Sequence, residues 1–289
     1  MRSEEQMLDL ILNTAKEDER IRAAILNGSR ANPDAPRDIF QDFDVVYLVT
    51  EVASFEQDTE WIKRFGEFMN LQTPDVMGDS PPNDDGSFAY LMQFSDGNRI
   101  DLTLYPIAKL GEFGQDSLSL LLLDKDSLIG ALPPASESDY LPQPPTPGEY
   151  ADCCNEFWWV CTYAAKGLWR EEIVYAKYML DNVVREQLVK MLEWHIGVKT
   201  GFSRNPGKFG KHFRQCLEPA LWELLQHTYA DAGIENTWDA LFAMCDLFRR
   251  VAVPVAEEFG FDYPYEDDRR VSAHLRHVRS LPEDAKEVY

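Results

Sequence analysis

Apolar residues in the first half of the chain follow both helical and strand-like patterns. Residues 4–16 place apolar side chains three or four positions apart, which predicts an amphipathic helix. Asp96 and Gly97 split the apolar stretch 88–105 into two predicted strands, because Asp-Gly favours the tight turn of a hairpin. Further runs predict strands at 21–27, 43–49 and 118–124, and a helix at 55–70.

Helical periodicity dominates the second half of the chain. The predicted helices cover 151–168, 171–197, 210–229, 236–260 and 266–280. Between the halves, residues 131–150 contain six prolines and no periodic pattern, which is typical of an extended linker. We therefore expect an α+β protein with a mixed-sheet domain at 1–135, a linker at 136–150 and a helical bundle at 151–289 that contributes to a substrate cleft.

Composition narrows the class of protein. The 289 residues are 45% hydrophobic, which is enough to form sizeable cores. No apolar run approaches the roughly 20 residues of a membrane span, and the opening MRSEEQMLDL lacks the core of a signal peptide. Five cysteines without a CxxC pair do not resemble a disulfide framework or a zinc site. A cytoplasmic protein is expected, without a membrane partner.

The chain is strongly acidic, with 50 Asp and Glu against 28 Lys and Arg and a net charge of −22. Such a field repels nucleic acid, so no nucleic-acid partner is expected. Two interpretations of the charge remain open, namely solubility or attraction of a small polycationic substrate. Charge alone favours solubility.

Three aspartates stand out in the predicted strands. Asp42 and Asp44 share one side of the strand at 43–49, since alternate residues of a strand point the same way. If the strand that contains Asp101 is its neighbour, all three carboxylates meet. Like charges this close repel unless a cation lies among them, and Mg²⁺ prefers oxygen ligands. The three aspartates therefore predict a magnesium site.

A glycine–serine pair precedes the first two aspartates. Gly28 lets the backbone approach a phosphate closely, Ser29 offers a hydroxyl donor, and Arg30 adds a positive charge. Gly-Ser alone is usually a turn and Asp-x-Asp alone is usually exposed charge. Their combination with Asp101 predicts a site for a metal and a nucleotide.

This combination resembles the signature of the nucleotidyltransferase superfamily. The wider sequence is similar to the aminoglycoside 6-adenylyltransferases over nearly its whole length, in the segments AILNGSRANP, IFQDFDVVYLV, FSDGNRIDLTL, CCNEFWWVCTYAAKGLWREE and MLEWHIGVKTGFS. The resemblance implies that residues 1–135 form the catalytic domain. It also implies transfer of AMP from ATP to the 6-hydroxyl of streptomycin, with release of pyrophosphate and resistance to the antibiotic.

Roles follow from the resemblance. Asp42 and Asp44 are expected to hold Mg²⁺, and Asp101 either completes the metal shell or takes the proton of the acceptor hydroxyl. Asp181 is a rival base, although a solvated helix carboxylate explains it as well. Apart from the resemblance, the segment 194–217 has five Lys and Arg and no acidic residues, so it either binds the β- and γ-phosphates, with Lys199 as its best candidate, or is an ordinary solvated loop.

Two alternatives to this function stay open. The protein could adenylylate a protein side chain, or it could be a nucleotide-binding relative without catalysis. The similarity of the helical half favours the aminoglycoside acceptor, and the intact aspartates favour catalysis.

Overall fold

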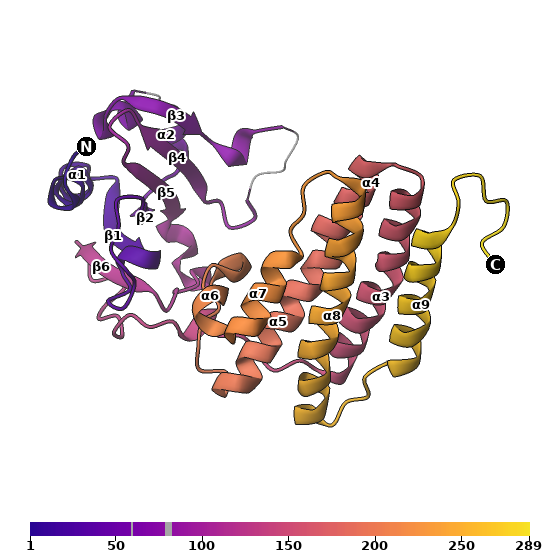
Figure 1. The fold of residues 1–289 in the computed structure, drawn as a ribbon. Helices are drawn as coiled ribbons and strands as arrows, with labels where there is room; N and C mark the ends of the chain where they lie inside the picture. The colour runs from indigo at the N-terminus through magenta and orange to yellow at the C-terminus, as the bar shows by residue number, and fades with distance from the viewer. Residues whose placement is uncertain (59, 79–82) are drawn as a thin grey trace. The chain divides into compact units, whose positions relative to one another are not determined.

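The structure is a computed structural model that describes residues 1–58, 60–78 and 83–289. The chain forms two compact units, Met1–Asp139 and Tyr140–Tyr289 (Figure 1). The first contains a mixed sheet and the second is helical, which confirms the predicted α+β class. Within the described ranges, no helix has both the length and the apolar character to cross a membrane.

The described part of the first unit contains a six-stranded sheet in the order β3-β4-β5-β2-β1-β6. Its strands are β1 (Ile21–Asn27), β2 (Phe43–Val49), β3 (Phe68–Gln72), β4 (Phe88–Phe94), β5 (Arg99–Pro106) and β6 (Ser119–Asp124). β2 and β5 pair in parallel, and the other neighbours pair antiparallel. The hairpin predicted at Asp96-Gly97 is confirmed as β4–β5.

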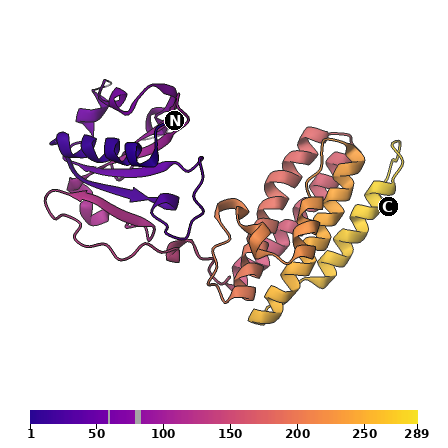
Figure 2. The same cartoon turned by 60° about the vertical axis from the view of Figure 1, so that its left-hand side comes forward.

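Helix α1 (Glu4–Glu17) begins at a capping box in which Ser3 and Gln6 satisfy each other's backbone N–H groups. The first unit has two apolar cores, one on each face of the sheet. The buried residues of α1 join the larger of these cores, on the face of the sheet against which the helix lies (Figure 2). Phe43, Val45 and Tyr47 belong to this core. The intervening positions of β2 face the other side, so strand alternation divides β2 as the sequence predicted.

The helix predicted at 55–70 is wrong. The described residues instead form α2 (Ala53–Glu56), the 3₁₀ helix η2 (Trp61–Phe65) and then β3, while residue 59 lies outside the described part. Gly66, with φ of +132°, ends η2 in a conformation that a helix does not continue. Phe55, Ile62 and Phe65, which have helical spacing, are nevertheless buried in the larger core of this unit, so the spacing indicated burial without one continuous helix.

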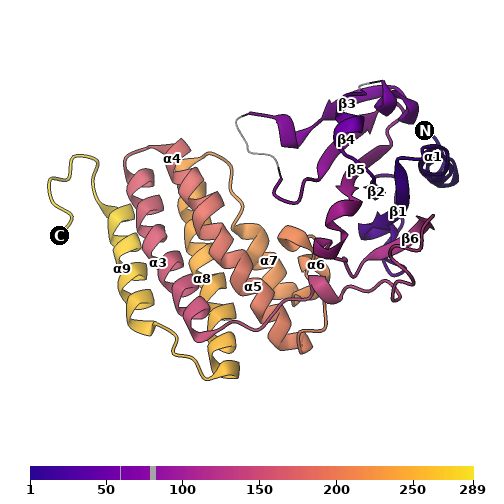
Figure 3. The same cartoon turned by 180° about the vertical axis from the view of Figure 1, so that it is seen from behind.

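The helices of the second unit are α3 (Pro147–Trp169), α4 (Ile173–Tyr178), α5 (Arg185–Thr200), α6 (Phe213–Cys216), α7 (Pro219–His227), α8 (Ile234–Phe259) and α9 (Tyr265–Ser280). Further short turns of 3₁₀ helix occur along the whole chain, in both units. They are η1 (Gly28–Arg30), η3 (Pro74–Val76), η4 (Ile107–Glu112), η5 (Ser138–Tyr140) and η7 (Lys208–Gly210). Views from opposite sides show α3, α5, α8 and α9 running alongside one another (Figures 1 and 3). Their apolar faces form one core.

Three helical predictions need correction. Helix α3 begins at Pro147, because Thr146 and Glu149 form a capping box, so residues 147–150 do not belong to an extended linker. The helix expected at 171–197 contains a π-helical segment, Met179–Val184, between α4 and α5. The helix expected at 210–229 is broken between α6 and α7, where Pro219 starts a new helix.

Candidate functional site

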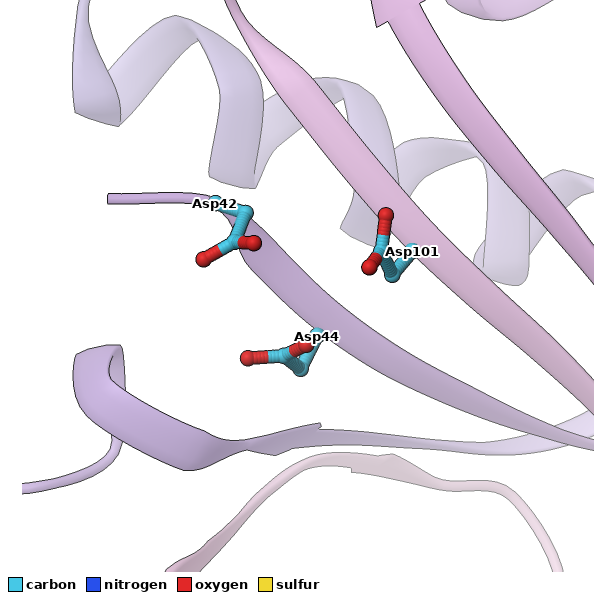
Figure 4. Close-up of side chains that lie close together, drawn as sticks. All are labelled: Asp42, Asp44 and Asp101. Carbon is cyan, nitrogen blue, oxygen red and sulfur yellow. The ribbon is translucent and has the colours of Figure 1, made fainter. Parts of the chain in front are cut away.

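Three carboxylates converge on two neighbouring strands of the sheet (Figure 4). Asp44 on β2 lies directly opposite Asp101 on β5 in the parallel register, and Asp42 precedes β2 on the same side as Asp44. One oxygen from each of the three lies within 4.8 Å of the others. The convergence predicted from the sequence is therefore confirmed.

The topology explains why these carboxylates meet. In a parallel pair, residues in register share a face of the sheet, so Asp44 and Asp101 point the same way. Farther along this face, Val46, Leu48 and Tyr105 lie in a smaller apolar core. The carboxylates thus occupy a half-buried end of the face. Two like charges at 4 Å repel by about 4 kcal/mol at an effective dielectric constant near 20, so this arrangement requires compensating positive charge.

Arg99 supplies positive charge within the protein. Its Nε and Nη2 donate to the two carboxylate oxygens of Asp101, each at 2.7 Å, and its Nε lies 3.8 Å from Asp42 Oδ2. These hydrogen bonds with Asp101, reinforced by the charges of Asp42 and Asp44, raise the pKa of Arg99. Arg99 did not stand out in the sequence. Its position two residues before Asp101 on one strand was the available signal, since such residues share a face.

Gly28 makes room for Asp44. A Cβ built at Gly28 would overlap Asp44 Oδ2, and Gly28 has a φ of +70°, where side chains are disfavoured. Its N–H donates to the carbonyl of Leu118 at 2.9 Å, which ties the bend to the start of β6. Ser29 follows in η1, and its carbonyl accepts a hydrogen bond from Gln41 Nε2 at 3.5 Å. The glycine–serine bend therefore lies against the carboxylates, as predicted.

The role expected for Arg30 does not fit its position. Its side chain is buried, and its Nε and Nη2 donate to the carbonyls of Asp42 at 2.9 Å and Gln41 at 2.6 Å. Nη1 pairs with Glu4, and the guanidinium lies over the ring of Phe43. These contacts occupy the guanidinium, so Arg30 holds the backbone that presents Asp42 instead of offering its charge to a phosphate.

The two remaining candidates lie in the helical unit. Lys199, in the last turn of α5, is half-exposed with its Nζ 3.8 Å from Glu218 Oε1. Asp181 lies in the π-helical segment and forms ion pairs at 2.8 Å with Lys177 and Arg185. Burial would raise the pKa of Asp181, but hydrogen bonds from Lys177 and Arg185 lower it. A carboxylate engaged in this way has a structural role in the helix.

The donor set fits a hard divalent cation. The cluster offers carboxylate oxygens from Asp42, Asp44 and Asp101, which are the ligands that Mg²⁺ and similar ions prefer. Across the ranges that the structure describes, this is the one group of three or more metal-ligating side chains close enough to share an ion. All three side chains are partly accessible, so an ion can reach them.

Known proteins are similar to the chain over nearly its full length. The family model for streptomycin adenylyltransferase matches residues 1–278. Aminoglycoside 6-adenylyltransferases from Bacillus subtilis and Campylobacter jejuni are 41% and 43% identical over 270 residues, which is 93% of this chain and 95% and 93% of theirs. The Staphylococcus aureus enzyme of the same name is 34% identical over 91% of this chain and 94% of its own.

A crystal structure of an aminoglycoside 6-adenyltransferase from Bacillus subtilis aligns with 97% of this chain and 100% of its own length, at 36% identity and a TM-score of 0.48. The resemblance noted in the sequence is confirmed by the family match and the relatives, as is the enzyme class of aminoglycoside nucleotidyltransferases. The chain belongs to the streptomycin adenylyltransferase family.

Proposed function

We propose that this cytoplasmic protein transfers AMP from ATP to the 6-hydroxyl of streptomycin, releases pyrophosphate and depends on Mg²⁺. The observation that carries the proposal is the convergence of Asp42, Asp44 and Asp101 beside the bend at Gly28. The match to the streptomycin adenylyltransferase family over residues 1–278 supports the choice of acceptor. Inactivation of the antibiotic is the expected consequence.

The reaction needs positioning and charge neutralisation more than covalent chemistry by the protein. The acceptor oxygen attacks the α-phosphorus, the bond to the β-phosphate bridging oxygen breaks, and pyrophosphate leaves with the electron pair of that bond. Mg²⁺, when bound, supplies positive charge to the phosphates. Asp42 and Asp44 would hold the ion, and Asp101 would complete its shell or accept the proton from the hydroxyl.

Phosphate binding falls to two separate segments in this proposal. The bend at Gly28 lies against Asp44, so the Ser29 hydroxyl and the backbone N–H groups that follow Gly28 would donate to phosphate oxygens. Lys199 would pair with the β- or γ-phosphate, because its present contact with Glu218 is long and solvent-exposed and so is easily exchanged. The net charge of −22 suits a cationic acceptor such as streptomycin.

The test is incubation of the protein with α-radiolabelled ATP, Mg²⁺ and a panel of aminoglycosides. We expect label to transfer to streptomycin, and Asp42→Asn to lose about 10³-fold or more in rate with the fold intact, since removing one ligand charge weakens a metal worth several kcal/mol to the transition state. Asp126→Asn is the matched control, because Asp126 pairs with Arg22 elsewhere in this unit.

The outcomes separate the parts of the proposal. Full activity of Asp42→Asn would remove Asp42 from the metal site. Transfer to a different aminoglycoside would overturn streptomycin as the acceptor, and transfer to a protein would overturn the whole acceptor class. ATP binding without turnover on any acceptor would overturn catalysis.

A further inference from the structure

Arg99 occupies the carboxylate oxygens that a metal ion would use. Its guanidinium takes both oxygens of Asp101 in a two-pronged contact, with N–O distances of 2.7 Å. The same group approaches Asp42 Oδ2 at 3.8 Å. Nearly half of the Arg99 side chain is exposed, so solvent, not protein packing, surrounds much of it. The contact can therefore open without disturbing the core.

We propose that Arg99 is the resident counter-ion of the carboxylate cluster and competes with the divalent cation for Asp101. The inference rests on the proposed metal site. Arg99 thus acts on the ion through Asp101, as a positioning residue that stabilises the cluster before the ion arrives. Binding of the metal becomes an exchange of one cation for another, instead of a simple association.

Two physical consequences follow from this exchange. A guanidinium fork engages both oxygens of a carboxylate, so Asp101 has to give up at least one of these hydrogen bonds to ligate an ion. The positive charge of Arg99 also repels a second cation at the same oxygens. Both effects weaken the affinity of the cluster for a free ion, and both are removed when an uncharged residue replaces Arg99.

The expected size of the effect comes from Coulomb's law. Nearly half of the Arg99 side chain is exposed, so solvent screens its charge more strongly than the repulsion among the half-buried carboxylates. At an effective dielectric constant close to that of water, removing this unit charge from beside a divalent ion changes the affinity by about tenfold. A purely structural role for Arg99 predicts the opposite sign, because loss of the fork would leave Asp101 poorly oriented and binding would weaken.

Manganese binding measures this effect without any enzymatic turnover. Mn²⁺ is titrated into the full-length protein in the absence of ATP, and the free ion is followed by electron paramagnetic resonance. We expect Arg99→Gln to bind Mn²⁺ about tenfold more tightly than the wild type. Arg99→Lys keeps the charge and should stay within about threefold of the wild type. If Arg99→Gln binds equally or less tightly, or if neither protein binds measurably, the proposal is overturned.

Arg22 provides the matched control. It makes a similar fork with Asp126, with both N–O distances 2.6 Å, on the same sheet. Asn27, at the other end of β1, is the residue that pairs with Asp44. At about 3.3 Å per residue, Arg22 lies about 16 Å from Asn27 along the strand, and so it is far from the carboxylates. Arg22→Gln should leave the affinity for Mn²⁺ unchanged. An equal change in Arg22→Gln would overturn a local role for Arg99.

Thermal unfolding supplies a second measurement. In EDTA, Arg99→Gln should melt below the wild type, because three carboxylates then repel without compensation. Mg²⁺ should raise its melting temperature more than that of the wild type or Arg22→Gln. An Mg²⁺ response of Arg99→Gln no larger than that of the wild type would overturn the proposal. Failure of AMP transfer to streptomycin would instead refute the proposed function, and the Mn²⁺ result would stand independently.

Discussion

Substitution of Gly28 by alanine should damage the site by two separable effects. The first is backbone strain, because Gly28 has a φ of +70°, and a residue with a Cβ pays about 1–2 kcal/mol in that region. The second is crowding, because the new Cβ would overlap the carboxylate oxygen of Asp44. That carboxylate would have to retreat from the position in which it meets Asp42 and Asp101.

The two effects have different magnitudes and different readouts. Strain lowers the free energy of unfolding of the first unit by about 1–2 kcal/mol. Displacement of a catalytic group by about 1 Å costs on the order of 10²-fold in rate, which corresponds to about 2.7 kcal/mol in the barrier. Urea unfolding measures the first quantity, and initial rates of AMP transfer to streptomycin at saturating Mg²⁺ measure the second.

Gly130→Ala separates strain from crowding. Gly130 has a φ of +72° in the same unit, and a Cβ there would meet nothing within 4 Å. It should lose as much stability as Gly28→Ala and keep wild-type kcat/KM. The reasoning is refuted if Gly28→Ala retains full activity, or if Gly130→Ala loses activity to the same extent.

Three further variants test contacts in both units. Arg30→Met should lower the free energy of unfolding by about 2–4 kcal/mol in urea and slow AMP transfer, because two carbonyls lose charged donors and Asp42 loses its support; unchanged stability would contradict this. Asp268→Asn should cost about 2–3 kcal/mol, because it breaks the charged hydrogen bonds with Arg249 at 2.6 Å. Burial would raise the pKa of Asp268 but hydrogen bonds from Arg249 and Tyr263 lower it, so this cost should persist above the ordinary pKa of 3.8 and shrink in urea titrations at lower pH. Burial lowers the pKa of His195 despite the charge of Glu218, so His195 of the unfolded chain takes up a proton first as the pH falls below about 6.5. The wild type should therefore lose more stability than His195→Gln between pH 7.5 and pH 5.5. Equal losses in the two proteins would refute the lowered pKa of His195.

Strand patterns allowed much of the site to be predicted. Alternation within 43–49 separates core residues from Asp42 and Asp44, and the structure shows the same division between two apolar cores. The sequence alone could not establish that β2 and β5 are neighbours in the sheet. The structure supplies both their parallel pairing and the register in which Asp101 lies opposite Asp44.

Apolar spacing alone did not predict the path of the chain at 55–70. Phe55, Ile62 and Phe65, which are seven and three positions apart, have helical spacing and all enter the core, but they do so from two short helical segments. Periodicity indicates which side chains are buried. It does not indicate whether the backbone hydrogen bonds of a helix run without a break through the segment. The glycine at 66 was the local signal that favoured a break, and β3 begins two residues later at Phe68.

Charged residues near the site could be located from sequence, but their partners could not. Arg30 follows Gly-Ser and so suggests a phosphate ligand, yet its contacts are backbone carbonyls eleven and twelve residues away that only the folded loop brings close. Arg99, by contrast, did not stand out in the sequence, because its contact with Asp42 joins β5 to the residue just before β2. Three carboxylates carry three negative charges, and a divalent ion that displaces Arg99 neutralises two of them. A triphosphate that enters this site brings further negative charge that other cations have to meet, and this is the physical reason for seeking a second source of positive charge such as Lys199.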